Sequence, residues 1–246
     1  MSNKYIESSL LEYEKLLTQS SFNTDFIYNN NNEIKKIFNY IYIINLLKNR
    51  AETKRFFGTD FNMTFSLLLE SSNSLYSGQC RASLLLLRSA QESTLQFITI
   101  KEREWILSNI DSSRQFIELD YRFTETKKKL VKDIKTSVDS NKYSEYYKNI
   151  DKTVTYYKKL CGVVHSTGKN IPVELSYYYS NLEVNTILEK KDFFELYLKS
   201  LECIFTLIYF LLRESFEKWD TYDLSDILKT IFKKDKKVQR FISFVK

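Results

Sequence analysis

Residues 78–98 read GQCRASLLLLRSAQESTLQFI, and the four consecutive leucines at 84–87 decide the fold class. At about 100° per residue, four successive positions face all sides of a helix. A helix that is apolar on every side is typical of the buried centre of a helical bundle. The stretch therefore predicts a central helix that begins after Gly78 and runs to about Trp105.

The chain has few residues that break helices. Its 246 residues include only four glycines and one proline. An all-β sandwich needs a turn about every ten residues, and α/β folds need tight glycine-containing turns. The composition therefore predicts an all-α, multi-helix bundle.

Further helices follow from apolar residues that recur at helical spacing. The expected spans are 4–20, 33–47 with Asn32 as a possible cap, 63–76, 109–137, 141–164, 192–218 and 223–245, the last as one or two short basic helices. Residues 170–181, with Pro172 and three consecutive tyrosines, are compatible with a loop or a short β-hairpin arm.

The chain is expected to form one domain, because no internal repeat or proline-rich linker divides residues 1–246. Within it, residues 1–60 are expected to form N-terminal helices, 61–218 a central bundle and 219–246 a basic helical tail. From 229 to 246 there are seven basic residues and one acidic residue, which account for the whole net charge of +6.

Composition also argues against several classes of protein. Cys80, Cys161 and Cys203 lie far apart in apolar helical runs, which predicts reduced, buried thiols in the cytoplasm. With a single histidine and no CxxC pair, neither a metal site nor a cofactor is expected. The longest apolar runs fall short of the roughly 20 residues that a membrane span requires. No P-loop, Rossmann or nucleophile-elbow motif occurs.

The predicted central helix carries a polar stripe. Arg81, Arg88 and Glu92 fall within about 40° of one another on the helical wheel, and Arg88 can pair with Glu92 at i,i+4. Two interpretations stay open. The pair is a structural ion pair that stabilises the helix in its register, or the stripe lines a cleft that handles an anion or a nucleotide.

The only histidine, His165, follows an apolar helix and precedes Ser166 and Lys169. A protonated histidine is favoured at a helix C-terminus, and nearby hydroxyl and amino groups suit phosphate. His165 is therefore interpreted as a helix cap, as a general acid or base, or as a contact to a partner.

The tail alternates basic and apolar residues. Its basic side chains are Lys233, Lys234, Lys236, Lys237 and Arg240, interleaved with Ile231, Phe232, Phe241, Ile242, Phe244 and Val245. The pattern suits a nucleic-acid-binding arm, an anionic membrane surface or a partner groove. It equally suits a packed terminal helix with a solvated face.

A helix with LLRSAQE (86–92) and a later helix that ends in VHS (164–166) resemble the HEPN-type helical domains. More narrowly, they resemble an uncharacterised HEPN-like group with an LRxxxE helix and a later H-S element. The resemblance covers roughly residues 60–215. It implies a helical bundle, often a homodimer, of the kind common in bacterial defence and toxin–antitoxin systems.

Some HEPN proteins are metal-independent ribonucleases in which an arginine and a histidine, four to six residues apart, cooperate at the dimer interface. In such chemistry histidine moves protons and a cation stabilises the charged phosphate. The matching position upstream of His165 holds Lys159, which supplies charge but not the bidentate fork of arginine.

Two functional hypotheses follow. In the first, the protein binds or cleaves RNA: His165 is the acid or base, Arg88 binds charge, Glu92 orients Arg88, and phosphate contacts come from Arg81, Lys159, Ser166, Lys169 and the basic residues of the tail. In the second, the protein is a non-catalytic helical adaptor or regulator that binds a protein partner. Arg88 and Glu92 then stabilise the core, and His165 is a cap.

Overall fold

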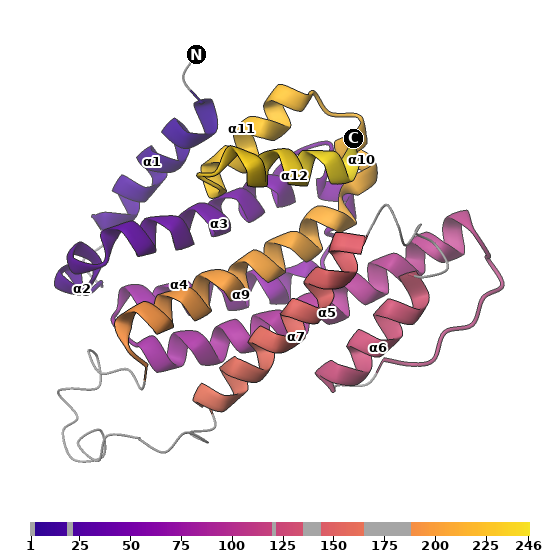
Figure 1. The fold of residues 1–246 in the computed structure, drawn as a ribbon, viewed down its shortest axis with the longest axis horizontal. Coiled ribbons are helices and arrows are strands. Elements are labelled where there is room, and N and C mark those ends of the chain that lie inside the picture. The colour runs from indigo at the N-terminus through magenta and orange to yellow at the C-terminus, as the bar shows by residue number, and fades with distance from the viewer. Residues whose placement is uncertain (1–2, 19–21, 120–121, 135–143, 165–187) are drawn as a thin grey trace.

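The fold is a bundle of α-helices (Figure 1). A computed structural model describes residues 3–18, 22–119, 122–134, 144–164 and 188–246. Over these ranges the chain has eleven α-helices, one 3-10 helix and no strand, so the predicted all-α multi-helix bundle is confirmed. The elements are α1 (Lys4–Leu17), α2 (Thr24–Asn29), α3 (Asn31–Asn49), η1 (Lys54–Phe56), α4 (Phe61–Tyr76), α5 (Cys80–Asn109), α6 (Phe123–Ile134), α7 (Ser144–Val164), α9 (Lys190–Leu211), α10 (Arg213–Glu217), α11 (Thr221–Ile231) and α12 (Asp235–Val245).

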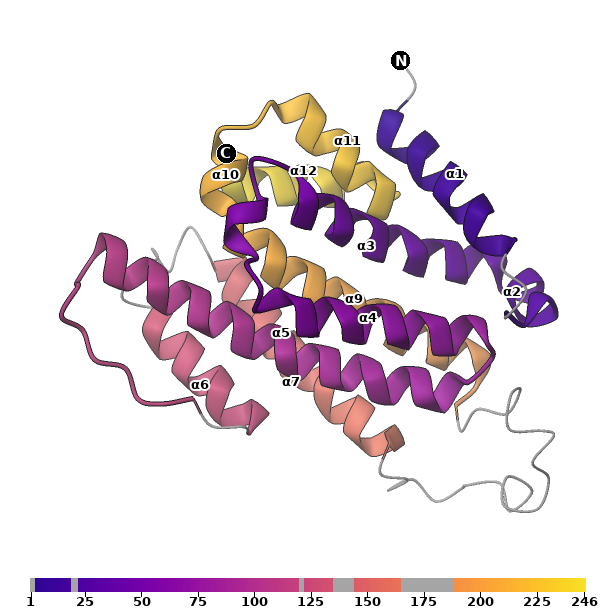
Figure 2. The same cartoon turned by 180° about the vertical axis from the view of Figure 1, so that it is seen from behind.

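Helix α9 forms the centre of the bundle. It packs against α3, α5 and α7, and between Leu201 and Leu211 every residue except Glu202 is buried. Figures 1 and 2 show α3, α11 and α12 on one side of α9, and α4, α5 and α7 on the other. The prediction that α5 is apolar and buried all round is wrong, because Leu85 is 44% exposed while Leu84 and Leu87 are fully buried. One face of α5 therefore lies at the surface.

Helices α4 and α5 form a tight helical hairpin through the short connection that contains Gly78. This glycine has φ 83°, in the left-handed region that favours glycine, and its N–H donates to the carbonyl oxygen of Leu75. The expected connection at Gly78 is thus confirmed, and α5 runs four residues beyond the expected end at Trp105.

Three expected helix boundaries are wrong. Within the expected helix 109–137, residues 111–119 are not helical and α6 begins at Phe123. Asp111 accepts a hydrogen bond from the backbone N–H of Ser113, and such local bonds compete with the helix. The expected helix 192–218 is divided at Leu212 into α9 and α10. Helix α3 begins at Asn31, so Asn32 lies inside it rather than capping it. The possible β-arm at 170–181 lies outside the described residues.

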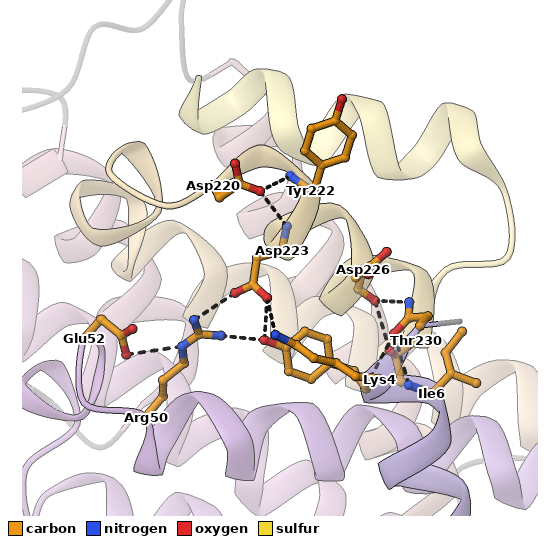
Figure 3. Close-up of polar contacts among 11 residues, drawn as sticks. Lys4, Ile6, Arg50, Glu52, Asp220, Tyr222, Asp223, Asp226 and Thr230 are labelled. Atoms are coloured by element: carbon orange, nitrogen blue, oxygen red, sulfur yellow. Dashed lines mark hydrogen bonds and ion pairs between the residues drawn. The ribbon is translucent and has the colours of Figure 1, made fainter. Parts of the chain in front are cut away.

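A polar network joins the N-terminal helix to the C-terminal part of the chain (Figure 3). Arg50 at the end of α3 donates to Asp223 of α11 (2.8 Å) and to the Tyr5 hydroxyl of α1 (2.8 Å), and its guanidinium lies over the Trp219 ring. Tyr5 donates to Asp223 (2.7 Å), and Lys4 lies 3.1 Å from the same carboxylate. The network therefore joins α1, α3 and α11, although α11 lies far from the other two helices in the sequence.

The tail is a packed terminal helix rather than a free arm. Helix α12 contacts α11 and α10, and Phe241 packs against Phe205 and Tyr209 of α9. Its buried residues are Val238, Phe241, Ile242, Phe244 and Val245. These side chains face the core, whereas Lys236 and Arg240 are exposed and Lys237 is half-buried.

Candidate functional site

The structure brings the predicted pair of α5 together. Arg88 Nη2 lies 3.0 Å from Glu92 Oε1, as the i,i+4 spacing predicts. The same nitrogen donates to the Tyr157 hydroxyl of α7 (3.2 Å), and that hydroxyl donates to Glu92. The Tyr157 ring stacks on Phe123 of α6, with ring centroids 3.9 Å apart. The cluster therefore joins α5, α6 and α7.

The polar atoms of this cluster are mostly paired with one another. Burial, together with the bond to Glu92, raises the pKa of Tyr157, so its hydroxyl stays protonated and can donate. Side-chain exposures of 21% for Arg88 and 30% for Glu92 leave only part of the pair open to solvent. This arrangement favours the structural interpretation of the pair. Tyr157 was not among the predicted site residues. A signal for it exists in the sequence, because Val154, Tyr157 and Cys161 recur at helical spacing and so share one face of the helix.

The other predicted site residues are placed by the structure only in part. Arg81 and Lys159 are exposed, and Lys159 lies over the Tyr156 ring. His165, Ser166 and Lys169 lie outside the described residues, so their roles stay predictions.

A second ion pair, which was not predicted from the sequence, is buried in the core. Arg213 of α10 makes two hydrogen bonds to Glu102 of α5, at 2.6 and 2.9 Å. The side chains are 8% and 1% exposed. The sequence does contain a signal for this pair, because Arg213 directly follows the apolar run of α9. The turn at Leu212 points Arg213 into the core, and the full pairing of both charges indicates a structural role.

The basic residues of the tail line a large groove. A cavity of about 1080 Å³ lies between α3, α9 and the connection from α11 to α12. Its lysines come from distant parts of the sequence: they are Lys36, Lys190, Lys191, Lys199, Lys233, Lys234 and Lys237. Tyr40, Phe194 and Phe232 contribute aromatic surface to the same cavity.

A smaller cavity of about 260 Å³ continues this groove. It shares Glu202, Lys234 and Lys237 with the larger cavity and adds Lys152 and further residues. The further lining residues include Lys236, Arg240, Phe241 and Phe244. All five basic residues predicted in the tail therefore lie on one continuous surface. We call the lining of the two cavities the basic groove.

Glu202 lies at the centre of the basic groove. Its carboxylate pairs with Lys237 at 2.7 Å and with Lys199 at 3.5 Å. The Lys237 ammonium also lies 4.2 Å from the centroid of the Phe232 ring. Burial lowers the pKa of Lys237, and the Lys199 and Lys152 charges add to this effect, whereas Glu202 opposes it. A bound anion would stabilise the same ammonium, because it adds negative charge.

The two cavities together are lined by ten lysine or arginine side chains and four glutamates. A concave surface with excess positive charge concentrates anions near it. The lysines supply the charges that the phosphates of a nucleic acid require. The aromatic rings of the lining are each less than 10% exposed, so they form the floor of the groove.

Other kinds of site find no support in the part of the chain that the structure covers. There, no three histidine, cysteine, aspartate or glutamate side chains gather closely enough to hold a metal ion. No helix of that part has the length and apolar character of a membrane span. The thiols of Cys80 and Cys203 are buried as expected, but Cys161 is only half-buried.

Comparison of the chain with protein-family models, curated proteins and solved structures gave no match. The described residues form a helical bundle with a concave surface on which basic side chains outnumber acidic ones.

Proposed function

We propose that the protein binds single-stranded RNA in the basic groove. One observation carries the proposal: basic side chains from α3, α7, α9 and α12 converge on one concave surface. Phosphates would contact the exposed Lys233, Lys234 and Lys236.

The resemblance to HEPN-like proteins supports RNA as the ligand and a bacterial defence or toxin–antitoxin setting in the cytoplasm. Cleavage of the bound strand by His165 with Arg88, without metal, stays a prediction of that resemblance. So does the homodimer, which sedimentation of the purified chain would test.

The test is titration of fluorescently labelled single-stranded RNA with the full chain, followed by anisotropy at several salt concentrations. Phosphate contacts release counterions, and each contact contributes about −0.7 to the slope of log K against log salt for single strands. We expect a steep slope. The triple variant Lys233→Gln, Lys234→Gln, Lys236→Gln should bind more weakly and reduce the slope by about 2.

A matched control removes the same charge elsewhere. The triple variant Lys15→Gln, Lys54→Gln, Lys128→Gln changes exposed lysines of α1, η1 and α6, none of which lines the basic groove. It should bind nearly as well as the wild type. Equal losses in both triple variants would show non-specific attraction. Salt-insensitive binding, or none, would favour the protein-binding adaptor.

A further inference from the structure

A third cavity adjoins one end of the basic groove. It has a volume of about 350 Å³ and lies between α2 and the beginning of α9. Lys190 and Phe194 line both this cavity and the larger cavity of the groove. The Lys190 ammonium donates to the carbonyl oxygen of Asn29 at the end of α2 (2.9 Å) and so lies at the junction. A strand that follows the groove can thus reach this cavity, which we call the end pocket.

The end pocket differs chemically from the groove. Its walls include Phe26, Phe193 and Phe194, and among the described residues its charged side chains are Lys190 and Asp25. The Asp25 carboxylate disfavours a phosphate inside. Phe26 is half-buried, so part of its ring remains accessible. The end pocket therefore suits a flat, uncharged group better than an anion.

Asn30, one of the residues that line the end pocket, has an unsatisfied polar atom. The residue is 6% exposed, and its Nδ2 donates to the carbonyl oxygen of Phe26 (2.6 Å). A carbonyl can only accept, which assigns the nitrogen to that side of the amide. Asn30 Oδ1 is buried and has no hydrogen-bond partner. A buried acceptor without a donor costs about 1–3 kcal/mol, so a ligand N–H at this point would be stabilising.

We propose that the end pocket takes one unstacked base of the strand held in the basic groove. The base stacks on Phe26, and an amino or imino N–H of its edge donates to Asn30 Oδ1. This inference rests on the proposed function, and it adds a requirement: the ligand is a single strand with an unpaired base near one end of the bound segment. Recognition of unstacked bases by aromatic faces and edge hydrogen bonds is the usual mode for single-stranded RNA.

The experiment compares RNA strands of equal length and charge in which each nucleotide in turn is made abasic. We expect one position at which loss of the base weakens binding about five- to hundredfold, the range for one base stacked on an aromatic ring. At that position the Phe26→Ala variant should bind the intact and the abasic strand equally. The control Tyr28→Ala removes an 84% exposed ring from the same helix, outside the end pocket. This variant should still bind the intact strand more tightly than the abasic strand.

Two results would overturn the inference. One is salt-dependent binding with no sensitive position, which leaves the basic groove intact as the RNA site. The other is a sensitive position whose effect survives in a folded Phe26→Ala protein. If Phe26→Ala fails to fold, photocrosslinking of wild-type protein to a thiouracil-containing strand decides: crosslinks to the end pocket support the inference, and crosslinks elsewhere refute it. Absence of any salt-dependent binding would instead refute the proposed function.

Discussion

Lys237 Nζ lies 2.7 Å from Glu202 Oε1, so an acidic side chain neutralises the most buried lysine of the basic groove. Glu202 also lies 3.5 Å from Lys199, and it is the one residue between Leu201 and Leu211 that is not buried. A negative charge at this position competes with a bound phosphate for the same ammonium groups. The pairing therefore has a measurable consequence for RNA binding.

We expect Glu202→Gln to strengthen the binding of single-stranded RNA. The substitution keeps the size of the side chain and removes the charge that faces Lys237 and Lys199. Near a protein surface such a change in local charge is worth on the order of 1 kcal/mol, or about fivefold in affinity at low salt. The gain should decrease as salt increases, because screening weakens the competing interaction.

Glu12→Gln is the control for that substitution, because it removes an equal charge from the exposed face of α1. Its affinity for RNA should stay near that of the wild type. Weaker binding by Glu202→Gln, with the fold intact, would mean that Glu202 positions the lysines rather than competing with the ligand.

The buried pair of Glu102 and Arg213 predicts a non-additive stability pattern. Glu102→Met or Arg213→Met alone leaves one buried charge unpaired and should lower the free energy of unfolding by about 3–5 kcal/mol. The double Met variant removes both charges and should be more stable than either single variant. Urea denaturation followed by tryptophan fluorescence measures this, since the Arg213 guanidinium lies 5.6 Å from the centroid of the Trp105 ring. A double variant no more stable than the singles would contradict the prediction.

Arg88 is expected to stabilise the junction of α5 and α7. Arg88→Met removes the bonds to Glu92 and Tyr157 and should lower the free energy of unfolding by about 1–3 kcal/mol. Tyr157→Phe should cost less, and the double variant should show coupling between the two residues. RNA affinity should change little, because neither residue lines the basic groove.

The opposite outcome would restore the catalytic interpretation of Arg88. An Arg88→Met protein that is as stable as the wild type, but has lost an RNA-cleaving activity that the wild type shows, would place Arg88 at an active site. Denaturation and cleavage assays on the same preparation separate the two cases.

Asp223 predicts a contribution to stability that is lost in acid. Burial raises its pKa, but hydrogen bonds from Tyr5, Lys4 and Arg50 outweigh this effect and hold the pKa below its ordinary value of 3.8. The carboxylate therefore stabilises the fold above that pH, and its contribution disappears as the pH falls through the lowered pKa.

We expect Asp223→Asn to lower the free energy of unfolding by about 1–2 kcal/mol at neutral pH. The difference from wild type should shrink below pH 3.8. Asp151→Asn serves as the control, since Asp151 pairs with Lys127 at an exposed position and should have little effect at any pH. If the difference in the free energy of unfolding between Asp223→Asn and the wild type stays constant across this pH range, the charge of Asp223 does not contribute to stability.

Local patterns in the sequence determined the helical architecture and one pair of the candidate site. Helix formation depends on neighbours within about four residues, so scarce glycine and proline and the recurrence of apolar residues were sufficient for an all-α bundle. The Arg88–Glu92 contact could be predicted for the same reason, because i,i+4 residues face one another on any helix. The helix breaks at Asp111 and Leu212 were not predicted, because the apolar pattern continues through both positions. A local turn interrupts the helix at Asp111, and the buried charge of Arg213 follows the break at Leu212.

Only the tertiary structure decided where the charges gather. Lys36, Lys190 and Lys237 are separated by many residues and line one cavity because α3, α9 and the beginning of α12 border it. Glu102 of α5 likewise meets Arg213 of α10 only through tertiary packing. The sequence showed that the tail is basic, but it left open whether the tail is a free arm or part of the bundle. Burial of Phe241 and its apolar neighbours on α12 decided this, because it places the tail lysines beside those of α9 and so forms the basic groove.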